Sequence, residues 1–541
     1  MPNIKTHQYI VIGSGPSGAI AAKTLVDKGA QVLMLDVGHQ DNKYEPLVPA
    51  LNYEEIRKTV KHQYRFFLGD QMEAVSIKDV KVGAQLSPSR KIMLKDVKEL
   101  IPILSDNFTP MESLAYGGLG VGWGLGTYTY NEAECEKAKL PYKEMQNSYQ
   151  YVANHIGISA PDDDFKPWVL GNIQHTQEAL HIDNSTEKIL QHYKENKSYF
   201  EKRQIYMGKS AMAILTQKKG ERKASSYSDM DFYTDKEKSA YRPQFTIDEL
   251  KKKSNFSYVG QQLVLSFEEI DSLVYVHCYH IKTKQRISYK TTKLILATGA
   301  LGSARLLMQS FPEIKKLPLL CNPYAYIPGI HLSMLGKKLD SQKNSMAQAM
   351  MIYDPTGKRD NLVSLAFYTY QSLMLHRLIK ESPLDIADNR LLFQYLQSAF
   401  VIAGIHHPDR SSSSKYLQLI ANDKTVSGNI LKAEYKLSAE EKKKINSNEK
   451  ILLKALRKIG IIPIKRIGAN AGSSIHYGGT IPFSEQEIIG RQASNGRIYG
   501  TKNVYIADSS GFNFLPAKGV TLSIMANAHR VCAPLNNKNT N

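Results

Sequence analysis

One histidine, His476, directly precedes a glycine turn in the stretch SSIHYGGTIPFS, residues 473–484. Imidazole changes its protonation state near neutral pH, so a histidine can accept a proton from a substrate hydroxyl. Taken alone, a histidine beside a turn is more often structural. A catalytic role for His476 therefore depends on what the rest of the chain could place beside it.

A second pattern that could do chemistry stands near the start of the chain, where Gly13, Gly15 and Gly18 form G-x-G-x-x-G. The first glycine permits a tight turn, the second lets a pyrophosphate approach the backbone, and the third lets a helix pack closely on a strand. The phosphates would lie at the helix N-terminus, where free N–H groups favour anions. Asp36 follows at the spacing of an acid that binds ribose hydroxyls. The motif predicts a dinucleotide site without choosing between FAD and NAD.

The segments around this motif predict the elements that must position it. Residues 8–13 are an apolar run that ends at glycine, residues 16–28 open with proline and read as a helix, and residues 31–36 are a second apolar run. Strand, helix and strand in so short a stretch predict a β-α-β unit with parallel strands.

Three later stretches carry related signals. The loop GGLGVGWG (117–124) is too long for a simple turn and could lay backbone N–H groups along a pyrophosphate or a flavin edge. ATGALGS (297–303) is another turn of small residues between a strand and a helix. Residues 495–531 read as strand, acidic turn, loop and helix, which again opens a helix N-terminus.

Length and composition indicate an ordinary globular protein of several domains. The 541 residues are enough for two to four units at about 100–200 residues each. The net charge of +19 favours a lysine-rich surface over nucleic-acid binding, because no nucleic-acid fold signature accompanies it. The positive charge is compatible with a weak association with a membrane surface, and it could attract anionic cofactors.

Location and cysteine usage follow from simple patterns. No apolar run approaches the ~20 residues of a membrane-spanning helix, and the first residues show no export signal, so we expect a cytoplasmic protein. The four cysteines are far apart and form no CxxC, so we expect reduced thiols, no disulfide framework and no metal.

Between these motifs the chain is less informative. Residues 185–255 are polar and lysine-rich and predict exposed helices and loops, residues 256–296 predict strands, and residues 345–435 an α+β region. Residues 437–460 predict a helix that begins at a Ser438–Glu441 capping box. Tyr368, Tyr370, His406 and His407 could line a polar pocket, although core or surface roles are favoured.

The order and spacing of these motifs resemble the glucose–methanol–choline (GMC) family of FAD-dependent oxidoreductases. The resemblance covers residues 8–38, 112–128, 256–310 and 470–533, and its motif style is closest to the sugar-oxidising, pyranose oxidase-like branch. It implies an α/β fold: a Rossmann-like FAD-binding domain with a parallel sheet, plus an α+β substrate domain with an antiparallel sheet. The expected FAD domain is discontinuous, with residues 1–50, 105–135, 240–315 and 468–541. The substrate or cap domain and insertions would take residues 51–104, 136–239 and 316–467.

The resemblance also implies the roles of individual residues. His476 matches the catalytic base of the family. The residues expected to bind FAD are Gly13, Ser14, Gly15, Ser17, Gly18 and Asp36 at the ADP half, Val264 at the adenine, Thr298 and Gly299 beside the cofactor, Gly117, Gly118 and Gly122 beside the flavin, and Asp508 with Ser509 at the ribityl or pyrophosphate region.

The sequence departs from the family pattern in three places. The family's second catalytic His or Asn corresponds to Gly519, so Lys518, Thr521 or Asn513 would have to substitute for it. Gly122 stands where some relatives bind flavin through a histidine, which predicts non-covalent FAD. The stretch ASSYSDMDFYTD lacks the cysteine cluster of some bacterial relatives, so no iron–sulfur centre or disulfide cluster is expected there.

Three functions compete at this point. The first is an FAD-dependent alcohol or sugar dehydrogenase or oxidase that acts on CH–OH donors with His476 as base, and passes electrons to oxygen, a quinone or a protein. The second is a FAD-binding protein of this type with lost, lyase or structural activity, which Gly519 motivates. The third is a basic protein that binds surfaces. The substrate, a small alcohol or saccharide in the first case, is not encoded in any motif.

Overall fold

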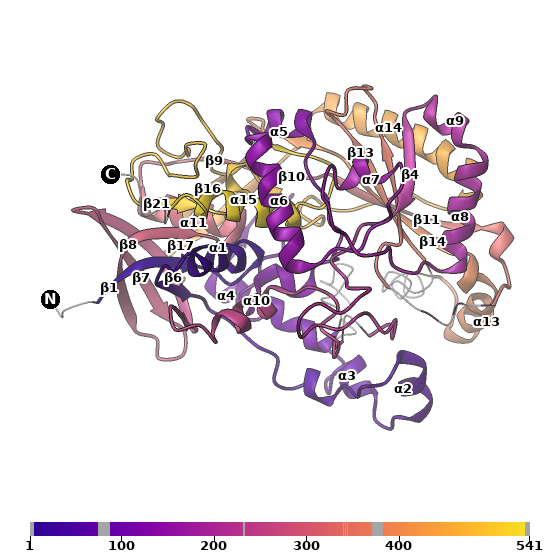
Figure 1. The fold of residues 1–541 in the computed structure, drawn as a ribbon, viewed down its shortest axis with the longest axis horizontal. Helices are drawn as coiled ribbons and strands as arrows, with labels where there is room; N and C mark the ends of the chain where they lie inside the picture. The colour runs from indigo at the N-terminus through magenta and orange to yellow at the C-terminus, as the bar shows by residue number, and fades with distance from the viewer. Residues whose placement is uncertain are drawn as a thin grey trace.

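The computed structural model describes residues 5–73, 87–230, 233–338, 340, 342, 345–369 and 382–535. Figure 1 shows two main sheets, one near the N-terminus and one on the other side of the molecule, with helices packed over each. Parallel strands in one sheet and an antiparallel second sheet confirm the mixed α/β architecture that the sequence predicts.

The first sheet has seven strands in the order β5-β2-β1-β8-β7-β6, with β21 also paired to β8. The five strands β5, β2, β1, β8 and β21 run parallel, whereas β6 and β7 form an antiparallel hairpin. Their bounds are β1 Thr6–Ile12, β2 Val32–Leu35, β5 Phe256–Val259, β6 Gln262–Ile270, β7 Leu273–His280, β8 Arg286–Leu296 and β21 Val504–Ile506. The central strands are apolar because helices cover both faces of the sheet.

Side chains of β1 alternate between two helical layers. Tyr9 and Val11 pack toward α1 (Pro16–Asp27) and α15 (Thr521–Cys532), whereas Ile10 and Ile12 pack toward α11 (Gly299–Ser310). The helices α6 (Tyr142–Ile156) and α10 (Pro243–Leu250) complete the first layer by contacting α15 and α1. The period of two along the strand thus sends each apolar side chain to one of the two cores.

The second sheet is antiparallel and has the order β18-β11-β14-β13-β12-β4, with β19 also paired to β11. Its strands are β4 Ile205–Lys209, β11 Tyr324–His331, β12 Ala349–Tyr353, β13 Val363–Tyr368, β14 Phe400–His406, β18 Ile461–Pro463 and β19 Ile467–Gly468. The helices α8 (Asn184–Glu195) and α14 (Ala439–Lys458) share a core with one face of this sheet. The capping box of Ser438 and Glu441 is present at the start of α14, as the sequence predicts.

The interpretation of residues 185–255 as exposed helices and loops needs a correction. Residues 205–209 form the edge strand β4, in which Ile205 and Met207 are buried against the sheet. This strand has only five residues within a lysine-rich segment, so its period-two pattern is too short to stand out.

Smaller elements link the two halves. A third sheet joins β3, β17, β16 and β9. Two short strand pairs, β10–β20 and β15–β22, connect the segments just before β11 and just after β14 to the C-terminal part of the chain. The bounds are β3 Ile103–Leu104, β9 Leu317–Pro318, β10 Leu320–Cys321, β15 Asp409–Arg410, β16 Lys415–Ala421, β17 Asn429–Tyr435, β20 Tyr477–Gly478 and β22 Phe514–Leu515. The remaining helices are α2 Tyr53–Thr59, α3 Tyr64–Phe67, α4 Val97–Leu100, α5 Glu132–Ala138, α7 Lys166–Val169, α9 Lys197–Glu201 and α13 Ile386–Leu396.

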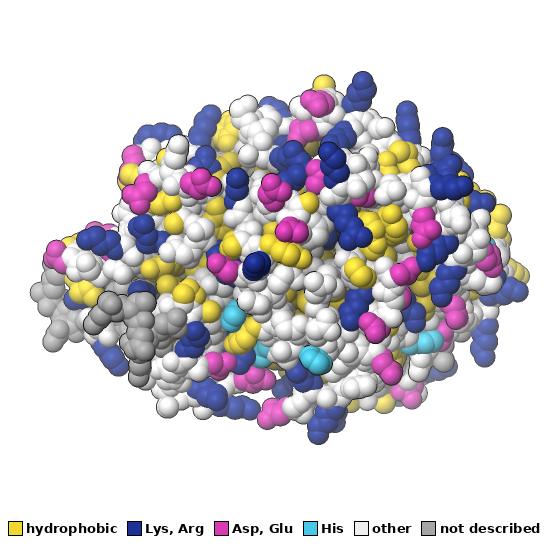
Figure 2. All heavy atoms as spheres, turned by 45° about the horizontal axis from the view of Figure 1, so that its top comes forward, with side chains coloured by type: hydrophobic (Ala, Val, Ile, Leu, Met, Phe, Trp, Pro, Cys, Tyr) yellow, Lys and Arg dark blue, Asp and Glu magenta, His cyan; other side chains and the backbone are white. Residues whose placement is uncertain are grey.

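Charged side chains lie on the surface, whereas the cysteines lie in the core. On the face shown in Figure 2, lysine and arginine side chains are scattered among acidic and polar ones. All four cysteines, Cys135, Cys278, Cys321 and Cys532, are buried free thiols. In the described parts of the chain, no helix is both long enough and apolar enough to cross a bilayer.

Candidate functional site

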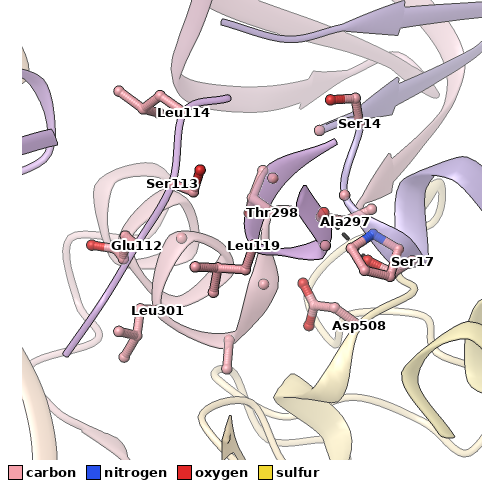
Figure 3. Close-up of a pocket in the computed structure, with 18 of the residues that line it drawn as sticks. Ser14, Ser17, Glu112, Ser113, Leu114, Leu119, Ala297, Thr298, Leu301 and Asp508 are labelled. Carbon is pink, nitrogen blue, oxygen red and sulfur yellow. Dashed lines mark hydrogen bonds between the residues drawn. The ribbon is translucent and has the colours of Figure 1, made fainter. Parts of the chain in front are cut away.

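A cavity of about 330 Å³ opens at the carboxyl ends of β1, β2, β8 and β21. This is the edge at which ligands bind in open parallel sheets. Its lining comes from segments far apart in sequence: residues 12–17, 35–37, 111–115, 118–120, 122–124, 262–264, 297–302, 305–306, 474–477, 508–509, 520–521 and 524 contribute. In the view of Figure 3, Glu112, Ser113 and Leu114 lie across the cavity from Ser14 and Ser17.

The glycines of the G-x-G-x-x-G turn have the three environments that the motif predicts. Gly13 has φ +95°, and a Cβ there would lie 2.8 Å from the Ala297 carbonyl oxygen. A Cβ on Gly18 would lie 1.9 Å from the Gly13 oxygen, so α1 can pack this closely only with glycine. A Cβ on Gly15 would meet nothing within 4 Å, which leaves its backbone open to the cavity.

Three helix N-termini converge on the cavity. Gly15 caps α1, Thr298 caps α11 and Val520 caps α15, and all three residues line the space. Each N-terminus presents free N–H groups and the positive end of a helix dipole. The three together favour an anionic group such as a diphosphate.

Asp36 connects the end of β2 to the glycine-rich loop. Its carboxylate accepts a hydrogen bond from Ser14 Oγ at 2.5 Å and another from Tyr258 at 3.1 Å, and Ser14 Oγ in turn accepts the Gly117 N–H at 2.8 Å. Burial raises the pKa of Asp36 to about 6, against the opposing effect of the two hydroxyl donors. The acid is therefore held in place while its remaining acceptor capacity faces the cavity.

Asp508 lies at the opposite end of the same sheet edge, directly after β21. Its carboxylate accepts hydrogen bonds from Ser303 Oγ at 2.6 Å and from the Ser510 N–H at 2.9 Å, and burial raises its pKa. Ser509 donates its hydroxyl to the Tyr477 carbonyl at 2.7 Å. This bond ties the Asp508 turn to β20, the strand that begins directly after His476.

The backbone around His476 is unusual. Ile475 has φ +60°, a left-handed conformation that a β-branched residue adopts only at a cost of roughly 1–3 kcal/mol. Gly479 has φ +66°, and a Cβ there would lie 2.6 Å from Leu320. Pairing of β20 with β10 holds the segment between these two residues. Strand pairing in the folded protein thus holds His476 in place, although the backbone before it at Ile475 is strained.

The His476 ring lines the cavity and has two neighbours of note. Its Nδ1 lies 3.2 Å from Asn322 Oδ1, and its ring stacks on His406 with centroids 5.1 Å apart. Burial lowers the pKa of His476 to about 4. Burial and the neighbouring His476 and His407 hold the pKa of His406 well below its usual range. Both imidazoles are therefore neutral at pH 7, and a neutral imidazole can accept a proton.

Most residues that the sequence predicts at the site line this cavity. They are Gly13, Ser14, Gly15, Ser17, Asp36, Gly118, Gly122, Val264, Thr298, Gly299, His476, Asp508, Ser509 and Thr521. Gly18 and Gly117 lie just outside it, where Gly18 packs on Gly13 and Gly117 donates to Ser14.

Two suggested partners of His476 lie elsewhere. Lys518 is buried and pairs with Glu134 at 2.8 Å, because the α5 N-terminal turn offers the carboxylate that a buried ammonium requires. Asn513 donates to the Phe483 carbonyl at 3.1 Å. At Gly519 a Cβ would lie 3.2 Å from the Tyr128 ring, so an aromatic ring occupies the space beside this glycine.

The residues suggested for a polar pocket separate in the structure. His406 stacks on His476, whereas His407 Nε2 lies 3.3 Å from Glu449 and away from the cavity. Tyr368 is at the end of β13 and does not line the cavity. Tyr370 lies outside the described residues.

Sequence reasoning missed several residues at the site. Arg305 donates to both carboxylate oxygens of Glu112, at 3.2 and 3.0 Å, and this buried pair lines the cavity. Asn322 contacts His476 across 154 residues of sequence. The only local signal at Asn322 is its position before proline, which indicates a turn and nothing about chemistry.

The fold and the cavity define a two-sheet α/β protein with a ligand site at the edge of its parallel sheet. No protein-family model matches the chain, and no curated protein matches it. Among solved structures, the chain is similar to pyridoxine 4-oxidase from Mesorbium loti, with a TM-score of 0.59 over 98% of this chain and 99% of that one. Sequence identity is 11%, so the likeness is one of fold.

Proposed function

We propose that the protein is an FAD-dependent oxidoreductase of the GMC type that oxidises a hydroxyl group with His476 as base. The observation that carries the proposal is that one cavity joins the dinucleotide motif at residues 13–18 to His476. The fold shared with an oxidase over nearly the whole chain supports it.

The residues present suit FAD. The open backbone at Gly15 and the N-termini of α1, α11 and α15 would take the diphosphate, and Asp36 the ribose hydroxyls. Val264 and the buried Glu112–Arg305 pair would lie beside the adenine. Gly122 offers no side chain for a covalent link, which supports non-covalent binding. When bound, FAD supplies a two-electron acceptor for the hydride of an alcohol.

Side chains of the protein would accept the proton of the substrate hydroxyl. His476 is neutral and can take the hydroxyl proton as the C–H bond breaks, which lowers the barrier to oxidation. His406 stacks on this ring from β14 and is also neutral, but it does not line the cavity. Of the three partners suggested from the sequence, Thr521 is the one that lines the cavity, so its hydroxyl would contact the substrate oxygen.

The substrate that we propose is a sugar or polyol-like alcohol, with oxygen, a quinone or a protein as electron acceptor, in the cytoplasm. A panel of sugars, polyols and pyridoxine would test this, the last because the structural neighbour is named for it. Purified protein should be yellow, release FAD on denaturation, and lose its colour when the right alcohol is added without oxygen. A colourless protein that binds no added FAD would refute the proposal.

One observation favours a second candidate, a flavoprotein without alcohol oxidation. The Tyr128 ring occupies the space beside Gly519, where the family places a catalytic side chain. In that case FAD would bind but no alcohol of the panel would reduce it. Oxidation of any alcohol of the panel would rule out this second candidate in favour of the oxidoreductase.

Replacing Asp36 by asparagine should weaken FAD binding about tenfold. The change keeps the shape and an acceptor for Ser14, but a hydrogen bond to a neutral group contributes about 1–1.5 kcal/mol less than one to a charged group. Fluorescence titration of the apoprotein with FAD would measure the affinity. Asp423→Asn, at an exposed turn, is the matched control and should bind FAD like wild type.

The pH dependence of alcohol oxidation should show the lowered pKa of His476. The base works when neutral, and it stays neutral from pH 7 down to its pKa of about 4. We expect kcat/KM to be level around neutral pH and to fall about tenfold per pH unit only below that pKa. A steady-state profile would check this, and an acidic limb centred at the ordinary histidine value of about 6.5 would contradict it.

A further inference from the structure

We infer that Asn322 fixes the tautomer of His476, so that Nδ1 carries the proton and Nε2 presents its lone pair to the cavity. The consequence for catalysis rests on the proposed function, whereas the tautomer itself does not. Asn322 would then be a positioning residue, because it acts on substrate only through His476.

The orientation of the Asn322 amide is set by three backbone carbonyls. Its Nδ2 donates to the oxygens of His407 at 2.8 Å, Pro516 at 3.0 Å and Leu515 at 3.5 Å. A flipped amide would turn Oδ1 toward three acceptors, which is repulsive. The group facing His476 is therefore Oδ1, which can only accept a hydrogen bond.

The proton on His476 follows from this orientation. Nδ1 lies 3.2 Å from Asn322 Oδ1, so Nδ1 must be the protonated nitrogen for the contact to be a hydrogen bond. A neutral imidazole carries one ring proton, so Nε2 holds the lone pair. Within the part of the chain that the structure describes, Nε2 has no hydrogen-bond partner, and His476 lines the cavity.

Asn322 can impose this state because it is rigidly held. It is 1% exposed and directly follows β10. The Cys321 N–H before it donates to Asp409 Oδ2 at 2.8 Å, and Asp409 pairs with the fully buried Lys415. The Tyr435 hydroxyl donates to the Cys321 carbonyl at 2.6 Å. A buried ion pair thus anchors β10, the strand that directly precedes Asn322.

His406, which stacks on His476, does not compete for the proton on His476 Nδ1. The His406 ring lies 27° from parallel to that of His476, so the two rings meet face to face. His406 is also neutral at pH 7, because burial and two nearby histidines lower its pKa. Within the described residues, the contact of a His476 ring nitrogen that selects a tautomer is the one to Asn322.

Protein labelled with ¹⁵N-histidine would report the tautomer directly. The His476 signal, assigned by its loss in His476→Ala, should show a protonated Nδ1 and an unprotonated Nε2 in wild type. In Asn322→Leu, which has similar volume and no acceptor, we expect a mixture or the opposite tautomer. Unchanged tautomer in a folded Asn322→Leu protein would overturn the inference.

Kinetic measurements on the FAD-loaded protein would test the role of Asn322 independently of the tautomer measurement. In Asn322→Leu, kcat should fall about 10–100-fold with KM within about twofold, the loss seen when the partner orienting a metal-binding histidine is removed. Asn322→Asp fits the site with its carboxyl protonated, because the oxygen that replaces Nδ2 must donate to the backbone carbonyls. The other oxygen still accepts from Nδ1, so this variant should keep the tautomer and most of kcat.

Asn513→Leu is the matched control. Asn513 is another asparagine that donates to a backbone carbonyl near the site, without contacting His476. It should leave the tautomer and the pH profile at their wild-type values. If Asn322→Leu does not fold, Asn322→Asp still decides, since a changed tautomer there would refute the inference. Failure of wild type to oxidise any alcohol would defeat the proposed function alone, because the tautomer remains measurable.

Discussion

Replacing His476 by alanine should leave a folded yellow protein whose flavin is reduced about 10²–10⁴-fold more slowly by its alcohol. Under the proposed function the neutral ring is the base in the cavity, so its loss would remove the acceptor for the hydroxyl proton. Folding should be preserved, because within the described residues the ring makes a single hydrogen bond, to Asn322. Anaerobic stopped-flow measurement of flavin bleaching would give the rate.

The control for this prediction is His181→Ala. His181 is an exposed histidine that pairs with Asp340 outside the cavity, so its removal should not change the bleaching rate. A His476→Ala protein that binds FAD normally and is reduced at the wild-type rate would show that His476 is not the base.

Replacing Lys518 by methionine should destabilise the fold by about 3–5 kcal/mol. Lys518 and Glu134 are 2% and 0% exposed, and their charged atoms lie 2.8 Å apart. Removing the ammonium leaves a buried carboxylate whose other hydrogen bond comes from the Asn131 N–H. The thermal midpoint should fall clearly, while KM for the alcohol should not change, because Lys518 does not line the cavity.

The double variant Lys518→Met with Glu134→Gln tests whether Lys518 stabilises the fold by pairing with Glu134 or instead binds substrate. It removes both charges, so much of the lost stability should return. If Lys518→Met instead raised KM and left the thermal midpoint unchanged, the lysine would bind substrate, as its place beside Gly519 suggested from the sequence.

Much of the fold around residues 6–36 could be predicted from local sequence. The apolar runs of β1 and β2, the proline at the start of α1 and the three glycines each have a short-range physical reason. The α14 helix was equally clear, because its capping box and apolar face are local patterns. The strand β4 was not, since five residues at a sheet edge carry too weak a pattern.

The residues of the site could be predicted from the sequence only where they belong to a recognisable motif. The glycine motif and Asp36 follow from spacing, and His476 followed from the resemblance to a family. Asn322 and His406 reach His476 only through pairing of β10 with β20 and through the register of the second sheet. Such contacts between distant segments leave no local trace. The same holds for Lys518, whose partner Glu134 is 384 residues away.

The buried cysteines have a consequence for the lifetime of the protein if it is the proposed oxidoreductase and its acceptor is oxygen. Peroxide attacks thiolates, and burial raises the pKa of Cys135, Cys278 and Cys321 to about 12 and that of Cys532 as well. All four thiols therefore stay protonated and out of reach at neutral pH. A protein built this way can release an oxidant beside its own core without oxidising these four thiols.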